Sequence, residues 1–298
     1  MTMTGRILVV GDVITDIVVV PQGPVARGTD TPATIRQMPG GSGANQAVWL
    51  AAMGADAHFA ARVGAGDVVR LTRHFEGQGV AAHLSGDEAN PTGTLICLVD
   101  TDGERSFLTD RGANAHLGET DLPFDLLDGM DRLHVSGYAL FEPKPRAAVM
   151  ALAARARAAN IPVSIDPAST GFLAEAGYDN FLGWAADAEI IFPNADEAEL
   201  LTGRTDPAHQ IAALLDIFPR VVLKRGREGA IYAARGGETL AMPAQAVEMV
   251  DTTGAGDAFL AGFLAADLRG EAPAAAMSAA IAAGARAVSR LGAQPLAL

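Results

Sequence analysis

The feature that most constrains the fold is an alternation of short apolar, strand-like runs with helical patterns along most of the 298 residues. The runs that we interpret as buried strands span residues 6–10, 133–136, 162–165, 190–192 and 221–223. Helical patterns span residues 43–53, 145–159, 172–184, 195–202, 254–268 and 273–291. Strands separated by helices form βαβ units. We therefore expect an α/β fold with a mostly parallel central sheet and helices on both of its faces.

Two regions interrupt this alternation. Extended segments at residues 18–20 and 33–37 enclose a stretch rich in Pro and Gly, and the turn Asp100-Thr-Asp-Gly103 predicts a hairpin. We expect these segments to form a small second sheet, a β lid built from roughly residues 14–38 and 92–110 that covers the ends of the parallel strands. Neither a linker nor a repeat is visible, so we predict a single domain over residues 1–298.

The charge of the chain argues against a nucleic-acid partner. The formal net charge is −13, and Lys144 and Lys224 are the only lysines. Nucleic-acid binding depends on cations that neutralise phosphates. Phosphate chemistry on this chain must therefore depend mainly on arginine, metal ions and backbone N–H groups, and we expect a small-molecule partner.

The sequence also indicates a cellular compartment. Cys97 is the sole cysteine, which rules out an intrachain disulfide and favours a reducing environment. Residues 1–6 lack a signal-peptide pattern, and no uninterrupted apolar run approaches the roughly 20 residues of a membrane helix. We therefore predict a cytoplasmic protein without a membrane partner.

The strongest local motif is VDTTGAGDAF at residues 250–259, which opens a long helix. Gly254, Ala255 and Gly256 carry almost no side chain, and their N–H groups lie where a helix N-terminus favours an anion. Asp257 falls in the first turn, and we expect the dipole and these donors to keep it ionised near pH 7. An ionised Asp beside an anion hole can accept a hydroxyl proton during phosphoryl transfer. For an isolated GAGD, a simple helix cap is the alternative interpretation.

A second glycine-rich motif, PGGSGANQA at residues 39–47, also precedes a helix. Gly41 allows a ligand to approach the backbone, and Asn45 offers both a donor and acceptors. The motif fails the dinucleotide-binding fingerprint because Gln46 stands at the third glycine position. The sequence also lacks a P-loop and the protein-kinase motifs. A flexible loop with a local cap is the alternative for this segment alone.

Together the two motifs resemble the signatures of the ribokinase/PfkB-like carbohydrate kinase family. Further similar segments follow in the family's order: Gly11-Asp12 with Asp16, Gly112-Ala-Asn114, the segment 194–203, the loop 224–229 and the end segment 290–295. The resemblance covers essentially the whole chain. It implies a ribokinase-like fold and an ATP-dependent kinase that uses Mg²⁺.

The resemblance also implies a role for each matching position. Asp257 would be the catalytic base and Gly254, Ala255 and Gly256 the anion hole; Asp12, Asp16, Gly41 and Asn45 would bind the substrate; Asn194, Lys224, Gly226, Gly229 and Gly256 would line the nucleotide site; Glu197 would organise Mg²⁺ through water; Asp251 and Thr253 would hold a monovalent cation such as K⁺. Capping of the helix at 195–202 is the alternative for Asn194 and Glu197.

Two positions depart from the family pattern. Ser42 stands where many ribokinase-like sequences have Lys, and Arg225 replaces an apolar residue before Gly226. Arg111 precedes Gly112 and lies on the expected substrate side, where a guanidinium suits a carboxylate. An exposed lid arginine is the alternative.

These observations predict transfer of the ATP γ-phosphoryl group to a hydroxymethyl group of a sugar. The alternatives are a kinase of a nucleoside or of an acidic sugar such as 2-keto-3-deoxygluconate, and a non-catalytic sugar- or nucleotide-binding regulator. A dinucleotide-dependent oxidoreductase is a further alternative that the failed fingerprint disfavours. An exposed lid face would let two copies form a homodimer.

Overall fold

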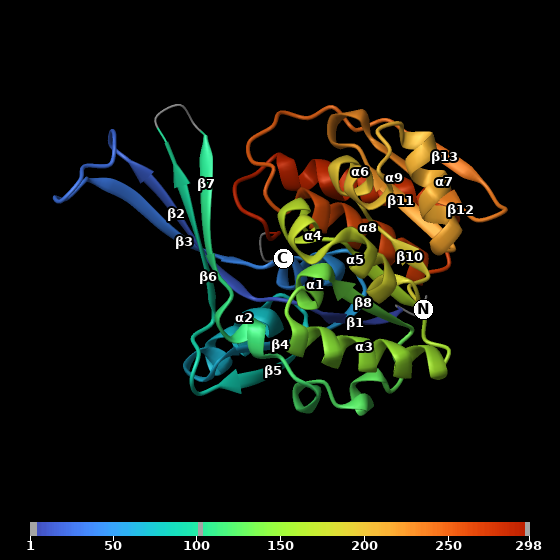
Figure 1. Cartoon of the computed structure of the whole chain (residues 1–298), viewed down its shortest axis with the longest axis horizontal. Coiled ribbons are helices and arrows are strands. Elements are labelled where there is room, and N and C mark those ends of the chain that lie inside the picture. Colours follow the sequence, from blue (N-terminus) through green and yellow to red (C-terminus); the bar gives the residue numbers. More distant parts are fainter. Residues whose placement is uncertain (1–4, 101–103, 296–298) are drawn as a thin grey trace.

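The computed structural model of the chain describes residues 5–100 and 104–295. Within these ranges a nine-stranded sheet forms the centre, in the order β13-β12-β11-β10-β9-β8-β1-β4-β5 (Figure 1). Neighbours from β11 to β5 pair in parallel, while β12 and β13 add an antiparallel edge. The strands are β1 (Arg6–Val10), β4 (Asp56–Gly64), β5 (Ala81–Asp87), β8 (Arg132–Ser136), β9 (Val163–Asp166), β10 (Ile190–Ile191), β11 (Arg220–Lys224), β12 (Ala230–Ala234) and β13 (Thr239–Met242).

Helices cover both faces of this sheet, which confirms the predicted α/β fold. One apolar core joins the sheet to α1 (Ser42–Ala52), α2 (Val68–Gly77), α8 (Ala255–Leu268) and α9 (Pro273–Val288). The other joins it to α3 (Pro143–Ala158), α4 (Thr170–Ala176), α5 (Tyr178–Ala185), α6 (Ala195–Thr202) and α7 (Pro207–Ile217). Short 3₁₀ turns connect the elements: η1 (Ala65–Asp67), η2 (Gly112–His116), η3 (Glu119–Asp121), η4 (Phe124–Leu127), η5 (Gly137–Leu140) and η6 (Gly226–Glu228).

The central strand β1 shows how the sequence separates the two cores. Ile7 and Val9 belong to the first core, and Leu8 and Val10 belong to the second. Successive side chains of a strand point to opposite faces, so a run of apolar residues fills both cores at once. This explains why the buried strands carry continuous apolar runs.

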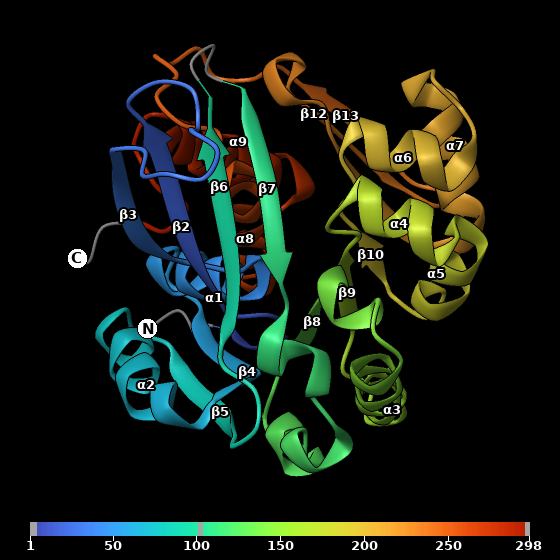
Figure 2. The ribbon, with the colours of Figure 1, turned by 60° about the vertical axis from the view of Figure 1, so that its left-hand side comes forward.

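The predicted second sheet is also present. It contains β2 (Ile14–Pro21), β3 (Ala33–Gly40), β6 (Gly93–Val99) and β7 (Arg105–Asp110), in the order β3-β2-β6-β7. These four strands project from the body beside α1 and α2, as Figure 1 and Figure 2 show. Most of the predicted turn between β6 and β7, residues 101–103, lies outside the described residues. The second sheet connects directly to the body, because β3 ends two residues before α1 begins.

One predicted helix differs from the structure. The pattern over residues 172–184 predicts one helix, but the chain forms α4 and α5 with Gly177 between them at a φ of 82°. A left-handed residue ends an α-helix, and glycine adopts this conformation without steric cost. Within the described ranges, no helix is long and apolar enough to cross a membrane.

Candidate active site

Several of the predicted site residues gather where the parallel strands of the large sheet end. Asp12 follows β1, Asp166 ends β9 and Lys224 ends β11. The N-terminal turns of α1 and α8 meet there as well, because Ser42 and Asp257 share a hydrogen bond. In open α/β sheets, ligands bind outside the carboxyl ends of the strands. The sheet topology therefore collects residues that are far apart in the sequence at one binding edge.

The N-terminus of α8 forms the predicted anion hole. Gly254 caps the helix in the left-handed conformation at a φ of 73°, and a Cβ there would lie 2.6 Å from the carbonyl oxygen of Ala293. Only glycine fits both constraints. A Cβ on Gly256 would lie 3.6 Å from Nζ of Lys224. The structure thus brings a cationic side chain to a helix N-terminus, and both attract an anion.

Asp257 lies in the first turn of α8 and is only 9% exposed. Its Oδ1 accepts hydrogen bonds from Ser42 Oγ at 2.6 Å and Gln46 Nε2 at 3.0 Å. Its Oδ2 accepts one from Asn45 Nδ2 at 3.1 Å. Three side chains of the PGGSGANQA segment therefore hold the predicted base.

Burial changes the protonation of this base. Removal from water raises the pKa of Asp257 to about 7, against the opposing hydrogen bond from Ser42 and with support from the negative charge of Asp166. A carboxyl group with this pKa is about half protonated at pH 7. The surrounding donors alone favour an ionised Asp257 near pH 7, but the cost of desolvation exceeds their effect and raises the pKa.

Asp166 is a site residue that the sequence did not reveal. Lys224 Nζ donates to its two carboxylate oxygens at 3.1 and 3.3 Å. Burial lowers the pKa of Lys224, but the charges of Asp166 and Glu197 outweigh burial and raise it overall. Lys224 is therefore a charged group at the anion hole. A signal existed in the sequence, since Asp166 directly follows the predicted strand at 162–165.

Asn194 and Glu197 form a reciprocal capping box at the start of α6. Glu197 N donates to Asn194 Oδ1 and Asn194 N donates to Glu197 Oε2, both at 2.8 Å. The capping alternative is thus present in the structure. Burial raises the pKa of Glu197 to about 7 although the charge of Lys224 opposes the rise. Asn194 also forms a backbone bridge to Lys224, so the cap lies next to the anion hole.

The N-terminus of α1 packs closely on the segment after β1, where the sequence predicts substrate binding. A Cβ on Gly43 would lie 2.6 Å from Cα of Gly11, so α1 packs backbone to backbone on the segment after β1. Asp12 Oδ1 accepts a hydrogen bond from Gly43 N at 3.0 Å, and Gly41 O accepts one from Asn45 N at 2.9 Å. The predicted residues Asp12, Gly41 and Asn45 are therefore brought together.

A cleft of about 520 Å³ opens between the second sheet and the body. Its lining includes Asp16 on β2 and both Asp251 and Thr253 before α8. Burial and the charge of Asp12 raise the pKa of Asp16 to about 6. Small-molecule sites commonly occupy about 300–1,000 Å³. This cleft is therefore large enough for a small ligand.

Arg111 follows β7 and packs beside the substrate side. Its Nη2 donates to the carbonyl oxygen of Tyr138 at 2.8 Å, and its guanidinium carbon lies 5.6 Å from the ring centres of Tyr138 and Phe172. Burial and the negative charge of Asp12 raise the pKa of Tyr138, so this ring lies close to the substrate side. Within the described residues, Arg111 Nε is buried and has no hydrogen-bond partner.

The remaining predicted residues lie in separate turns. Asp251 Oδ1 accepts hydrogen bonds from Thr253 N and Oγ1 at 3.0 and 2.7 Å, which fixes the turn before Gly254. Gly226 and Gly229 lie in and directly after η6, the turn that joins β11 to β12. They therefore extend from Lys224 along the sheet edge.

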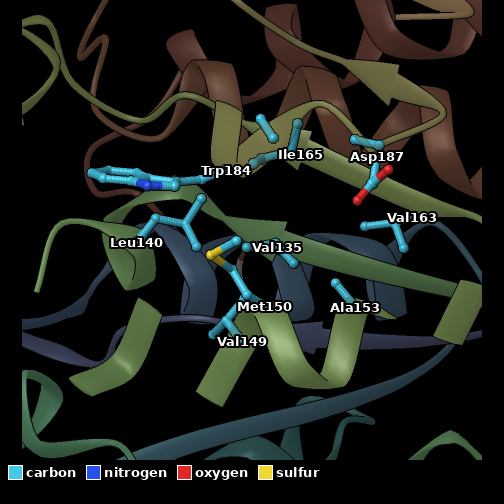
Figure 3. A pocket seen from close by; sticks show the side chains of 11 residues that line it. Val135, Leu140, Val149, Met150, Ala153, Val163, Ile165, Trp184 and Asp187 are labelled. Carbon is cyan, nitrogen blue, oxygen red and sulfur yellow. The ribbon is translucent and has the colours of Figure 1, made fainter. Parts of the chain in front are cut away.

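A second cavity lies on the face of the large sheet that α3 and α5 cover (Figure 3). Its volume is about 30 Å³, and its lining is mostly apolar, with Val135, Met150 and Trp184 among the side chains. A space of this size holds about one water molecule. We therefore assign no ligand to it.

The charged and polar groups at the sheet edge fit a nucleoside triphosphate with Mg²⁺. Lys224 and the α8 N-terminus supply positive potential, and Glu197 is a buried carboxyl group next to them. Among the described residues, no cluster of three or more His, Cys, Asp or Glu side chains is placed to hold a metal alone. Mg²⁺ usually keeps several waters and binds through phosphates and one or two carboxylates, so this set is sufficient.

Comparison with known proteins identifies the family. A family model described as pfkB family carbohydrate kinase matches residues 4–297. The chain belongs to the pfkB family of carbohydrate kinases. This confirms the resemblance carried by the two glycine-rich motifs of this kinase.

Individual relatives agree with the family. A fructokinase from Klebsiella pneumoniae is 34% identical to this kinase, and the match covers 88% of this chain and 84% of the relative. An ATP-dependent ribose-1-phosphate kinase from Halopiger xanaduensis is 33% identical over 87% of this chain and 84% of the relative. The names of the relatives thus differ in substrate.

Solved structures support the fold. A putative ribokinase II from Escherichia coli, in complex with ATP and Mg²⁺, superposes with a TM-score of 0.85 at 24% identity, over 97% of this chain and 94% of that one. The ribokinase-like architecture, with its small second sheet, is therefore confirmed for this kinase.

Proposed function

We propose that this carbohydrate kinase transfers the γ-phosphoryl group of ATP to a hydroxymethyl group of a sugar, with Asp257 as the base. The observation that carries the proposal is a buried carboxyl group in the first turn of α8, directly after the anion hole at Gly254–Gly256. A base must lie beside both the acceptor hydroxyl and the donor phosphate. Asp257 lies between the substrate side at Asn45 and the phosphate side at Lys224.

The reaction then follows from the arrangement. The hydroxyl proton of the sugar passes to a carboxylate oxygen of Asp257, and the hydroxyl oxygen forms a bond to the γ-phosphorus. The bond from that phosphorus to the β–γ bridging oxygen breaks, and ADP leaves with the bonding electron pair. The N–H groups of the α8 N-terminus and Lys224 stabilise the charge of the transferring group. When bound, Mg²⁺ neutralises phosphate charge, and Glu197 would hold it through water.

The substrate side supports a polyhydroxylated acceptor. Asn45 Oδ1 is buried and accepts no hydrogen bond within the described part of the chain. A sugar hydroxyl that donates to it would satisfy this acceptor, as would hydroxyls that donate to Asp12 or Asp16. The relative named fructokinase supports a neutral ketose as the first substrate to test.

Arg111 supports an acidic sugar as a second candidate. Its Nε has no hydrogen-bond partner among the described residues, and a carboxylate would accept from a guanidinium in two parallel bonds. The rings of Tyr138 and Phe172 hold the guanidinium in place, so it is pre-organised for such a contact.

We further propose a closing lid, a homodimer and a cytoplasmic location. Closure of the β2-β3-β6-β7 sheet over the cleft would exclude water and suppress ATP hydrolysis. The sheet exposes Ile35, Phe107 and Leu108 at 62%, 59% and 63%, and light scattering of the purified protein tests whether these surfaces pair two copies. The single Cys97 suits a reducing compartment, which cell fractionation tests.

The test of function is a coupled ADP-release assay over fructose, ribose, a nucleoside and 2-keto-3-deoxygluconate. The assay uses Mg²⁺ and is run with and without K⁺, which tests the proposed cation role of Asp251 and Thr253. We expect one sugar to release ADP, and Asp257→Asn to lower kcat about 100-fold or more without loss of substrate affinity. Binding of sugar and nucleotide without turnover on any acceptor would instead support the non-catalytic regulator.

A further inference from the structure

A buried polar network continues from Asp257 into the sheet through Gln46. Gln46 lies on α1, one turn after Ser42, and none of its surface is exposed. Its Nε2 lies 3.0 Å from Asp257 Oδ1, 3.3 Å from Asp166 Oδ2 and 3.0 Å from Ser42 Oγ. One amide group therefore contacts both the proposed base and the carboxylate that pairs with Lys224.

The other end of Gln46 contacts a buried histidine. Gln46 Oε1 lies 3.0 Å from His134 Nε2, and His134 Nδ1 lies 2.9 Å from Ser164 Oγ. Because an amide oxygen only accepts, His134 must carry its proton on Nε2, and Nδ1 then accepts from Ser164. Burial lowers the pKa of His134 to about 3, so the ring is neutral and carries a single ring proton.

A flipped amide would place its oxygen against the two carboxylates of Asp257 and Asp166, which is unfavourable. The carboxylates therefore select the orientation, and His134 completes it by donating from Nε2 to Gln46 Oε1. We propose that Gln46, held by His134, is a positioning residue that orients Asp257 for proton transfer and holds it at a fixed distance from Asp166. This inference rests on Asp257 as the base of the proposed function.

The electrostatic consequence follows from the neighbouring charges. The charges of Asp166 on β9 and Lys224 on β11 act on the pKa of Asp257, and the charge of Asp257 in turn raises the pKa of Tyr138 in η5. The Gln46 amide donates to Asp257 and Asp166 at once, so it stabilises their ionised forms together. Without that donor, the repulsion between the two carboxylates would be less well compensated. The pKa of Asp257 would therefore rise.

The test compares pH profiles of kcat/KM for the wild type, Gln46→Met and His134→Phe. Methionine keeps the length of the side chain and removes the amide, and phenylalanine keeps a ring and removes Nε2–H. We expect the acid limb of the profile to move up by about one pH unit in Gln46→Met, since hydrogen bonds to charged groups have about this effect. His134→Phe should move the limb in the same direction by a smaller amount.

Gln210→Met is the matched control. Gln210 is also a buried glutamine, but its Nε2 donates to the backbone carbonyls of Arg204 and Ala195. We expect this variant to lower the melting temperature and to leave the pH profile unchanged. A shift in the control as large as that in Gln46→Met would attribute the effect to general loosening and overturn the proposal.

The outcomes also separate this inference from the proposed function. Coincident profiles for the wild type, Gln46→Met and His134→Phe, with Asp257→Asn inactive, would overturn the positioning role alone. An equal loss of kcat/KM at every pH would assign Gln46 a structural role and would also overturn the inference. Normal turnover of Asp257→Asn would remove the base and with it the proposed function. If Gln46→Met does not fold, His134→Phe alone decides the question.

Discussion

The replacement Asp257→Asn should stabilise the ligand-free protein above neutral pH while it removes activity, and the gain should grow with pH. Asp257 ionises near its ordinary value of 3.8 in the unfolded chain and near pH 7 in the folded protein. The folded protein therefore binds more protons in this window, so its stability falls as pH rises from about 4 to 7. The shift of about three units corresponds to about 4 kcal/mol that the wild type loses by pH 8. Asparagine is neutral and avoids this loss.

The pH difference gives the clearest measurement. Asparagine keeps one acceptor oxygen but turns an NH₂ group toward the donors of Ser42, Asn45 or Gln46, which costs about 1–3 kcal/mol at any pH. That cost cancels when two pH values are compared. Linkage then predicts that the advantage of Asp257→Asn in unfolding free energy is about 2–3 kcal/mol larger at pH 8 than at pH 5. Urea unfolding without ligands at both pH values measures it.

Asp267→Asn is the control on the same helix. Asp267 is also largely buried, but hydrogen bonds and charge from Arg220, together with the charge of Arg132, outweigh burial and hold its pKa below the usual value. Its replacement should destabilise the protein at both pH values because it removes one of the two carboxylates that pair with the buried guanidinium groups of Arg132 and Arg220. An Asp257→Asn effect that is the same at pH 5 and pH 8 would show that burial does not perturb this carboxyl group, and the reasoning would fail.

Three further predictions concern activity and binding. The kcat/KM of the wild type should rise with pH through about 7 as Asp257 ionises, and a flat profile from pH 5.5 to 8 would contradict its role as base. Gly254→Ala should lower kcat about tenfold or more because its Cβ meets a carbonyl oxygen. Gly236→Ala, also at positive φ but with open space around it, should only lower stability, by about 1 kcal/mol. Steady-state kinetics and thermal melting separate the two effects. Lys224→Met should raise the KM for ATP about tenfold or more. It should also destabilise the protein by about 3 kcal/mol at pH 8, because Asp166 is left buried without its cation. A KM within twofold of the wild type would exclude Lys224 from the phosphate site.

Local sequence signals predicted the parts of the site that depend on backbone conformation. Gly254 and the residues after it indicated a helix N-terminus, and α8 begins at Ala255. The central strand β1 was predicted with its observed bounds because its apolar run fills both cores. Glycine positions and apolar runs act over a few residues, so a single sequence shows them.

Features that depend on long-range packing could not be predicted from local sequence patterns. Gln46 and Asp166 are 120 positions apart, and only the sheet topology places them in contact. The protonation of Asp257 depends on how fully α1 and α8 bury it, which no local pattern reports. The interior strand β4 was not predicted although its apolar residues alternate with polar ones, because three of its nine residues are Ala, which is depleted in strands.

The direct contact between Gly11 and Gly43 has a consequence for substrate choice. The floor of the proposed acceptor site there consists of backbone, so it offers no side chain that mutation could exchange to suit a different sugar. An attempt to retarget this kinase must then act through the lid strands and the surroundings of Tyr138 and Arg111. A library that varies those positions and keeps both glycines would explore new acceptors while retaining the machinery for phosphoryl transfer.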